Sequence, residues 1–435
     1  MSTNTATLPA AILTGAANTA FETEASRAIH PRVPADRIAA VRFLRELGRA
    51  LGTYGASANR LEDALRSCAR ALGVDAEFFA TPTGVFVTVA SDEGSQTLIA
   101  PINSSEVNLE KLAQLDRVLS DVVTGELDMR AASQRVSDIE RAPVRYGAAT
   151  TLLAFTLTSA SAAMLFSGSW ADIGAAAFAG LAIGIVTLGA AVGQSSVRLL
   201  EFASGAIAAV LGALAATALG AHPATVTLAG LIVLVPGLTV TTAMNELATR
   251  HLVAGSARLM GALIVFVMLG FGVAVGERAA EAFGWMTTPT FATASPAEWM
   301  LTIPLAVIAF PLMVLFKAAP RDWIWITLAT LIGFVGARLG AEWIGPGIGA
   351  GLGALLVGLA ANSTARLLDR PAAIMAAPGI LLLVPGSFGY RSIAALMDNE
   401  ALAGIETAFN MLLIAASIVT GLLMASLFVP PRKAL

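Results

Sequence analysis

The chain has 435 residues, of which 56% are hydrophobic and 13% are charged, and its mean hydropathy is +0.75. This composition lies outside the range of soluble globular proteins and indicates a membrane protein. The net charge of −3 is too small to favour nucleic acid as a partner. The single cysteine, Cys68, excludes an internal disulfide, and the three histidines are too far apart in sequence to predict a metal site.

The charged residues divide the chain into two parts. Residues 1–146 hold 33 of the 57 Lys, Arg, Asp and Glu residues, so a polar amino-terminal part precedes a membrane domain. Residues 1–35 are rich in Ala and Thr and poor in large apolar side chains, which predicts a disordered leader. Because no basic residue precedes its apolar stretch, we do not interpret this leader as a signal peptide.

Residues 36–146 are predicted to form a small cytosolic α+β domain. Apolar residues at helical spacing predict two consecutive helices, with Ser57 as the amino-terminal cap of the second. Asn108 is expected to cap a third helix that Gly125 closes, and a polar helix over about 128–141 follows. Short runs between turn sequences predict an antiparallel meander over Asp75–Ala80, Val85–Ala90 and Gln96–Pro101.

Ten apolar stretches of about membrane-spanning length follow the soluble domain. They lie near 147–167, 173–193, 202–220, 224–244, 257–276, 300–316, 323–340, 344–361, 374–392 and 408–428. The predicted fold is therefore a mainly α integral membrane protein with five-helix repeats over 147–276 and 300–435, joined by an external linker over 277–299. In the eighth stretch, the four-residue spacing of Gly345, Gly349 and Gly353 predicts close helix packing.

Basic residues predict the orientation of these spans. With a cytoplasmic amino terminus, the inner loops and tail carry Arg198, Arg250, Arg258, Lys317, Arg321, Arg366, Arg370, Arg432 and Lys433, and the outer loops carry Arg278, Arg338 and Arg391. Nine against three follows the positive-inside rule, which places both termini in the cytoplasm. An excess of Arg over Lys, 24 to 3, hints at a GC-rich bacterial source.

An octapeptide is repeated in two of the spans. Gly-Leu-Ile-Val-Leu-Val-Pro-Gly at 230–237 returns as Gly-Ile-Leu-Leu-Leu-Val-Pro-Gly at 379–386, 149 positions later. A Pro-Gly pair opens a helix, and the freed backbone groups need protein or a water-filled cavity at membrane depth. Because each half has an odd number of spans, we expect the second half to insert inverted, with the two breaks at similar depth.

The broken spans supply the candidate substrate site. A half-helix that starts after Pro236 and Gly237 exposes unpaired amides and the positive end of its dipole, which suits a carboxylate. Thr239 and Thr242 share a helical face with Glu246. We expect these hydroxyls to bind a polar side chain or zwitterion, and Glu246 either to hold an ammonium group or to take a coupling proton. The second copy contributes Pro385, Gly386, Ser387 and Tyr390.

Structural explanations are open for the same residues. The Pro-Gly pairs could be simple kinks, and the threonines could satisfy carbonyls that the break frees. Glu246 lies near the cytoplasmic end of its span, where a solvated loop carboxylate is the alternative. The chain has no Walker, Gly-x-Ser-x-Gly or His-Glu-x-x-His sequence, so we predict no catalytic residue, no metal or other cofactor, and an ion or proton gradient as the energy source.

Several short motifs together resemble the threonine/serine exporter family over almost the whole chain after about residue 38. They are Arg60-Leu61-Glu62, Val107-Asn108-Leu109 with Leu115-Asp116, Val235-Pro236-Gly237 through Glu246-Leu247, Gly255 with Arg258-Leu259, and Val384-Pro385-Gly386. The resemblance implies a cytoplasmic-membrane exporter of threonine and serine that the proton motive force drives. The family more often has Asp at the position of Glu246, and related two-chain systems are linked to dicarboxylate export.

We therefore predict a secondary exporter of small hydroxy amino acids rather than an enzyme. Its partners would be threonine, serine, protons and the lipid bilayer, and a homo-oligomer stays open. An exporter of dicarboxylates or other small organic acids is the nearest alternative. A membrane-anchored hydrolase that acts through residues 36–146, and a passive channel, are alternatives of other classes.

Overall fold

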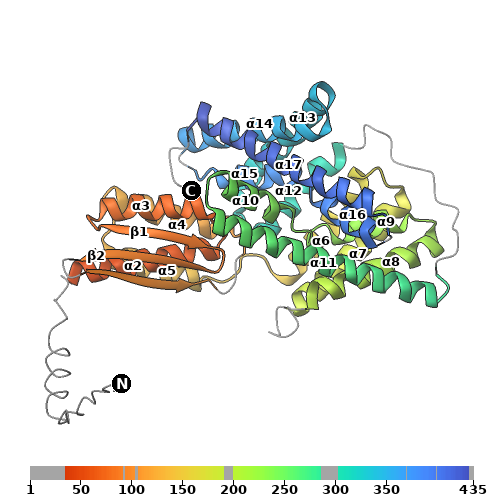
Figure 1. Cartoon of the computed structure of the whole chain (residues 1–435), viewed down its shortest axis with the longest axis horizontal. Coiled ribbons are helices and arrows are strands. Elements are labelled where there is room, and N and C mark those ends of the chain that lie inside the picture. Colours follow the sequence, from red (N-terminus) through yellow and green to blue (C-terminus); the bar gives the residue numbers. More distant parts are fainter. Residues whose placement is uncertain are drawn as a thin grey trace, which may run out of the picture.

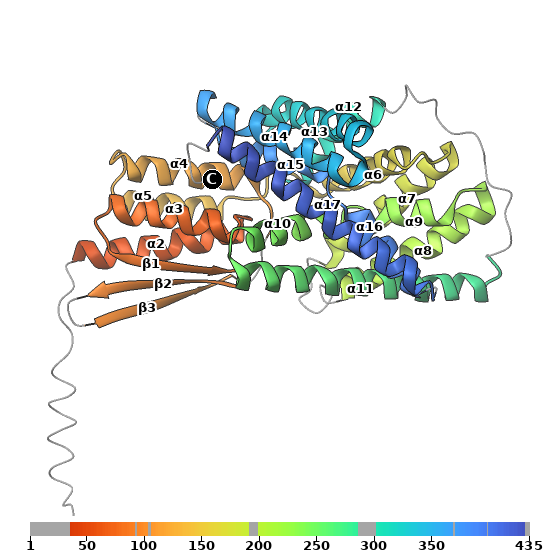
Figure 2. The same cartoon turned by 45° about the horizontal axis from the view of Figure 1, so that its top comes forward.

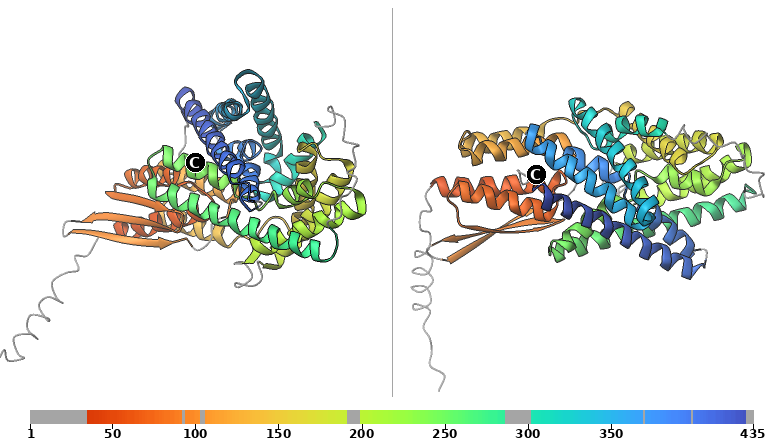
Figure 3. Two further views of the ribbon diagram at one scale, coloured as in Figure 1. Left: turned by 45° about the vertical axis from the view of Figure 1, so that its right-hand side comes forward. Right: turned by 90° about the horizontal axis from the view of Figure 1, so that it is seen from above.

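A computed structural model describes residues 35–91, 94–102, 106–190, 199–285, 302–368, 370–397 and 399–430. The leader predicted for 1–35 lies outside these residues except for Ala35, and most of the linker predicted for 277–299 does so too. An α+β domain over residues 35–141 lies at one end of a helical bundle in every view (Figures 1, 2 and 3). It corresponds to the part of the chain predicted to be soluble and is called the soluble domain below.

The soluble domain combines four helices with one sheet. Its elements are α2 (Ala35–Thr53), α3 (Ala58–Ala71), β1 (Ala76–Thr81), β2 (Gly84–Ser91), β3 (Gly94–Pro101), α4 (Leu109–Val123) and α5 (Met129–Arg141). The predicted helices and strands are confirmed. Asn108 caps α4 because its side chain accepts a hydrogen bond from the Lys111 amide at 3.0 Å. Ser57 occupies the cap position of α3, but its hydroxyl donates to Asn59 instead.

The sheet is an antiparallel meander in the order β1-β2-β3, as the turn sequences predict. Successive residues of a strand point to opposite faces. Val85 and Val87 are fully buried on the face against which α2 and α3 pack, whereas Phe79 and Ile99 are half exposed on the other (Figure 2). Burial of one face holds the helices, and thereby the start of α3, against the sheet.

The membrane domain contains twelve of the described α-helices. They are α6 (Ala148–Leu165), α7 (Trp170–Ala190), α8 (Leu200–Leu219), α9 (Pro223–Leu231), α10 (Gly237–Ala248), α11 (Leu252–Ala282), α12 (Thr302–Leu315), α13 (Trp323–Ile344), α14 (Pro346–Leu368), α15 (Ala373–Leu381), α16 (Gly386–Met397) and α17 (Ala401–Phe428). A short 3-10 helix, η3 (Pro320–Asp322), precedes α13. Eight stretches of the described chain are long and apolar enough to cross a bilayer, which identifies an integral membrane α protein.

Helix α11 is longer than the predicted span. It runs from the edge of the soluble domain, beside β1, to the far end of the bundle (Figure 2). It therefore continues to Ala282, six residues into the stretch predicted as external linker. Charged residues in its last turns, such as Glu277 and Arg278, lowered the apolar signal without ending the helix.

Both Pro-Gly pairs interrupt a helix, as predicted. Helix α9 ends at Leu231 and α10 begins at Gly237, while α15 ends at Leu381 and α16 begins at Gly386. Pro236 has φ −82° and ψ 41°, which is outside the helical region. Because proline has no N–H to donate, the α-helical hydrogen-bond ladder stops at this point.

The same backbone turns recur in the two halves at a nearly constant offset in the sequence. Among the described residues, four non-glycine residues have positive φ. Ser167 (60°) and Lys317 (50°) are 150 positions apart, and Arg250 (66°) and Asn399 (63°) are 149 apart. Non-glycine residues rarely adopt this conformation, so the pairing indicates the same turn geometry at two points in each half.

Close helix packing follows the same offset. Gly272 of α11 lies against the backbone of Phe202 in α8, and 149 positions later Gly421 of α17 lies against the backbone of Gly351 in α14. Gly255 packs on the turn of Ala243 and Leu247, and Gly404 packs on the turn of Ser392 and Leu396, again 149 positions later. The repeated contacts extend the similarity from the octapeptide to the packing of each half.

The glycine run at the start of α14 is only partly a packing surface. Gly349 and Gly353 lie directly against the backbone of α13, as their spacing predicts. For Gly345 the packing prediction is wrong, because a Cβ at that position would meet no atom within 4 Å. Gly345 instead follows the last residue of α13 with φ +103°, a conformation that glycine adopts without steric cost.

Candidate functional site

The two interrupted spans cross at their Pro-Gly pairs. A Cβ atom added to Gly237 would lie 3.1 Å from the Gly386 Cα and would also collide with the Val384 side chain. A Cβ added to Gly386 would in turn lie 3.3 Å from the Gly237 Cα. Both glycines are buried, and a larger residue at either position would force the backbones apart. The structure thus brings together the two breaks that the octapeptide marks.

The amino-terminal ends of two half-helices meet at this crossing. The amides of Leu238 and Thr239 in α10 have no backbone acceptor among the described residues, and neither do those of Gly386 and Ser387 in α16. The buried Pro385 and the half-buried Pro236 immediately precede these turns. Two positive helix ends with unpaired donors form a suitable receptor for a carboxylate.

The threonines after the first break differ in their hydrogen bonds. Thr241 is buried and donates its hydroxyl to the Gly237 carbonyl at 3.3 Å, so it satisfies a backbone group of its own helix. Thr239 and Thr242 are partly exposed, and their hydroxyls bond to no other described residue. The Ser387 hydroxyl is in the same situation on α16. These three hydroxyls are therefore available to a ligand.

Tyr390 lies four residues into α16 and points away from solvent. It lines a cavity of about 150 Å³ together with Gly270, Val273 and Glu277 of α11. Ligand pockets usually occupy about 300–1,000 Å³, so this cavity alone is small for an organic ligand. The cavity extends from Tyr390 to Met397 along α16 and to Glu281 along α11, so it leads away from Gly386.

Glu246 does not lie at the crossing. It is nine residues beyond Gly237, which is about 13 Å along the axis of α10. Its side chain is 0% exposed and forms a bidentate ion pair with Arg258 of α11, with N–O distances of 3.0 and 3.1 Å. Its Oε1 atom also accepts a hydrogen bond from the Ala58 amide at 2.9 Å. The alternative of a solvated loop carboxylate is therefore wrong.

The ion pair belongs to one half of the membrane domain only. At the positions 149 residues later, Ala395 replaces Glu246 and Thr407 replaces Arg258. The Thr407 hydroxyl donates to Ala403 in its own helix. Because the surrounding turn is repeated and the charges are not, the pair serves a contact that only this copy of the turn makes. That contact is with the first residue of α3 in the soluble domain.

The first residue of helix α3 in the soluble domain forms a hydrogen bond to this ion pair. Ala58, whose amide donates to Glu246, is the first residue of α3, so the carboxylate lies at the positive end of that helix. One turn further, the Glu62 carboxylate lies 3.4 Å from the Nε2 atom of His251, which precedes α11. Glu62 also accepts from the Ala80 amide of β1 at 2.9 Å.

A second contact joins the soluble domain to the other half. The first two amides of α4, those of Leu109 and Glu110, donate to the carbonyls of Phe316 and Lys317 at 2.9 and 3.3 Å. The Tyr146 hydroxyl donates to the next carbonyl, that of Ala318, at 2.6 Å. The chain that leaves α12 is thus held at the positive end of α4. The soluble domain contacts both halves of the membrane domain.

Two buried aspartates outside the crossing were not identified as candidate site residues from the sequence. Asp172 at the start of α7 accepts from Ser169 and pairs with His222, and Asp322 just before α13 pairs with Arg370. The two aspartates are 150 positions apart, and each partner lies shortly before a broken span, His222 directly before α9 and Arg370 three residues before α15 begins. Applying the octapeptide offset to the charged residues would have revealed them as a pair.

Cys68 and Ser169 are two of the described residues whose side chains are of the nucleophilic type. Burial raises the pKa of the Cys68 thiol to about 12, so it is not a thiolate at neutral pH. The Ser169 hydroxyl donates to Asp172 and not to His222, and it therefore lacks the adjacent base that activates a serine. Neither environment supports nucleophilic catalysis.

Two family models match the chain. One, described as a putative threonine/serine exporter, matches residues 42–279, and the other, described as a threonine/serine exporter, matches residues 300–428. The chain belongs to the threonine/serine exporter family. The family is one of membrane exporters and not of enzymes.

The chain is also similar to fungal proteins named pheromone-regulated membrane protein 10. That of Yarrowia lipolytica is 27% identical over 399 residues, which cover 83% of this chain and 31% of the relative. Those of Candida albicans and Eremothecium gossypii are 24% and 25% identical, covering 86% and 87% of this chain and 34% and 51% of the relatives. This exporter-family chain thus spans a third to a half of their length. No solved structure matches it significantly. The bacterial source stays a prediction.

The crossing leads to a prediction about Gly237. Gly237→Ala should destabilise the exporter-family protein by about 1–3 kcal/mol, because the added methyl group pushes α10 away from α16. Thermal unfolding in detergent would measure this loss. Gly261→Ala in α11 is the matched control, since its Cβ meets open space, and it should leave stability unchanged or raise it slightly. Equal effects at both positions would contradict the close crossing.

The ion pair leads to a double-mutant prediction. Glu246→Ala leaves Arg258 without its partner and should cost about 3–5 kcal/mol of stability, and Arg258→Thr should cost a similar amount. The double variant copies the residues that the second half carries at these positions, so its loss should be much smaller than the sum. Denaturation of the three purified variants would measure this coupling, and additive losses would show that the two side chains act independently.

Proposed function

We propose that this protein is a secondary active exporter of threonine and serine, driven by the proton motive force. The observation that carries the proposal is the contact between Gly237 and Gly386, which joins two half-helix amino ends inside the bundle. Membership in the threonine/serine exporter family supports the choice of substrate. An exporter of dicarboxylates or other small organic acids is the second candidate, because the same unpaired amides would accept any carboxylate.

The crossing supplies groups for each part of a hydroxy amino acid. The substrate carboxylate would accept hydrogen bonds from the unpaired amides of α10 and α16, which the Pro-Gly breaks at 236–237 and 385–386 leave without a helical acceptor. Thr239, Thr242 and Ser387 would bond the substrate hydroxyl or ammonium group. Tyr390 would close the site on the side of α11.

The transport movement would follow from an inverted repeat. We propose ten spans, with α9–α10 and α15–α16 each counted as one broken span, arranged as two five-helix repeats of opposite orientation. The repeated turns and glycine contacts support this arrangement. One repeat would rock against the other about the Gly237–Gly386 contact. This movement would open the site alternately to the two sides of the membrane. Both termini would lie in the cytoplasm, where the soluble domain contacts both repeats.

Glu246 would serve as the proton-coupling group. In this conformation its two oxygens accept three hydrogen bonds, from Arg258 and from Ala58. Protonation would cancel its charge and weaken the pair with Arg258, so the soluble domain would be released from the first repeat. Proton binding would thereby be coupled to movement of the two repeats through the contact between Glu246 and α3 of the soluble domain. Direct contact between Glu246 and the substrate would not be needed.

Transport by the full chain in liposomes tests this function. Vesicles that impose a proton gradient should show threonine transport that a protonophore abolishes, whereas a passive channel would ignore the protonophore. Glu246→Gln should remove the dependence on the gradient without lowering protein yield, because it preserves the shape of the side chain and removes its titration. Gradient-dependent transport by this variant would refute the role of Glu246.

The substrate contacts have a separate test. Thr242→Val should weaken threonine binding about fivefold to tenfold through loss of one hydrogen bond, measured as a rise in KM. Thr241→Val is the matched control, because that hydroxyl already bonds to its own helix, and its KM should not change. Competition by succinate as strong as that by serine would favour the organic acid alternative.

A further inference from the structure

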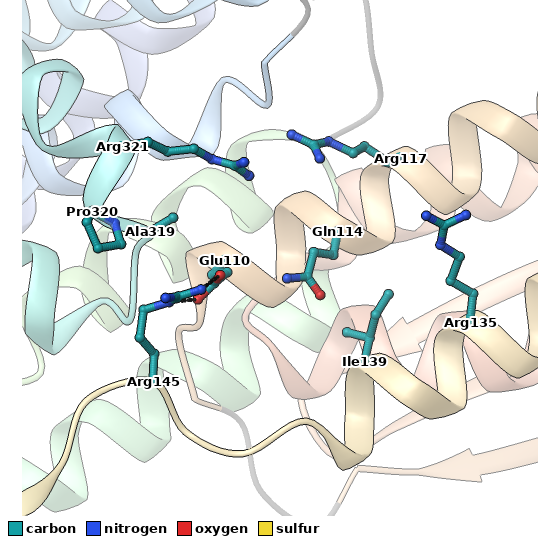
Figure 4. Close-up of a pocket in the computed structure, with 9 residues that line it drawn as sticks. All are labelled: Glu110, Gln114, Arg117, Arg135, Ile139, Arg145, Ala319, Pro320 and Arg321. Atoms are coloured by element: carbon teal, nitrogen blue, oxygen red, sulfur yellow. Dashed lines mark hydrogen bonds and ion pairs between the residues drawn. The ribbon is translucent and has the colours of Figure 1, made fainter.

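A second cavity lies where the soluble domain meets the membrane domain. It encloses about 500 Å³, which is in the usual range for a small-molecule site. Its lining comes from α4, α5, η3 and the segment before α6, and consists of Glu110, Gln114, Arg117, Arg135, Ile139, Arg145, Ala319, Pro320 and Arg321 (Figure 4). The cavity thus lies beside the second contact of the soluble domain, away from the Gly237–Gly386 crossing.

The charges around this cavity are unbalanced. Four arginines and a single carboxylate line it, which leaves a formal charge of +3. Glu110 is already taken by the guanidinium of Arg145, which binds both of its oxygens. Arg117, Arg135 and Arg321 form no ion pair with any carboxylate in the part of the chain that the structure describes. Three guanidinium groups therefore line one cavity without a salt bridge to a carboxylate among the described residues.

The arginines line the same cavity from different elements. Figure 4 shows Arg321 of η3 and Arg117 of α4 reaching toward each other, while Arg135 of α5 lies beyond Gln114 and extends toward α4. Like charges at such positions repel one another, and this repulsion acts between the soluble domain and the membrane domain. An anion between them would convert the repulsion into attraction from both sides.

We propose that this cavity binds a phosphate-bearing anion with at least two negative charges, which links α4 and α5 to η3. Guanidinium groups bind phosphate oxygens in bidentate geometry, and three of them match a multiply charged group better than a single carboxylate. A zwitterionic amino acid fits poorly, because its ammonium group would be repelled. Ile139 and Pro320 form an apolar wall for an organic part of the ligand.

Two sources share this chemistry. Arg321 immediately follows the start of the candidate span Pro320–Ile344, and Arg145 lies three residues before α6, so both lie where lipid headgroups would be. Arg117 and Arg135 belong to the soluble domain, which a free cytosolic phosphate compound would reach. Lipid phosphate and free phosphate therefore need separate arms in the test.

The test uses the full chain in phosphatidylcholine nanodiscs, with sodium pyrophosphate as the soluble probe. Pyrophosphate should raise the melting temperature saturably, beyond the effect of potassium chloride at the same ionic strength. Arg117→Gln, Arg135→Gln and Arg321→Gln should each weaken its binding about tenfold. Arg130→Gln is the matched control, since it removes an exposed arginine of the same helix α5 that does not line the cavity.

The second arm replaces part of the phosphatidylcholine with phosphatidylglycerol. If the lipid headgroup occupies the site, this lipid should stabilise the wild-type chain, compete with pyrophosphate, and lose its effect in the three variants. Without any anion the three variants should be as stable as the wild type or more stable, because each removes repulsion, and this excludes misfolding as the cause of lost binding. No response to either probe, a response that the variants keep, or equal binding of succinate would overturn the proposal.

Discussion

The approach of two backbones at Gly237 and Gly386 constrains the rest of the membrane domain. Neither position has room for a Cβ atom, so the amino ends of α10 and α16 come within van der Waals distance of each other. Each half-helix then has first-turn amides without a backbone acceptor. Unpaired donors are costly away from water, and a bound carboxylate would relieve that cost. The same Pro-Gly break, repeated in two helices, places both sets of amides at one point.

Symmetry between the halves makes their differences informative. Turns, glycine contacts and the buried aspartates recur at offsets of 149 or 150 residues, which shows that the two halves share a packing plan. The Glu246–Arg258 pair does not recur, since Ala395 and Thr407 occupy the later positions. It is also the place where α3 of the soluble domain begins. A buried ion pair is a poor source of stability, so a role in connecting the two domains explains it better.

The soluble domain bridges both halves on one side of the bundle. Its α3 amino end lies on Glu246 of the first half, and its α4 amino end receives the carbonyls after α12 in the second half. In both cases a helix dipole and unpaired amides make the connection. Any relative movement of the two halves on this side must therefore strain or break at least one of these contacts. The arginine-lined cavity lies beside the second of them.

Much of the architecture could be predicted because it depends on local patterns. The helices of the soluble domain, its meander, the cap at Asn108 and the two helix breaks all follow from periodicity, turn residues and proline chemistry within short segments. The prediction that Glu246 shares a site with Thr239 and Thr242 came from helical spacing. Spacing shows that the three residues lie on one face of a helix, but it does not show which other elements pack against that face. Gly345 was assigned to helix packing for the same reason, although it ends a helix.

The sequence by itself determined that there are two halves and two breaks, because duplication and the missing N–H of proline are properties of the covalent chain. Only the tertiary structure decided which residues those breaks and charges meet. Arg258 is twelve residues from Glu246 and Ala58 is 188 residues away, yet both bond to one carboxylate. Such partners depend on how helices and domains pack in space, and no periodicity within a single segment specifies that packing.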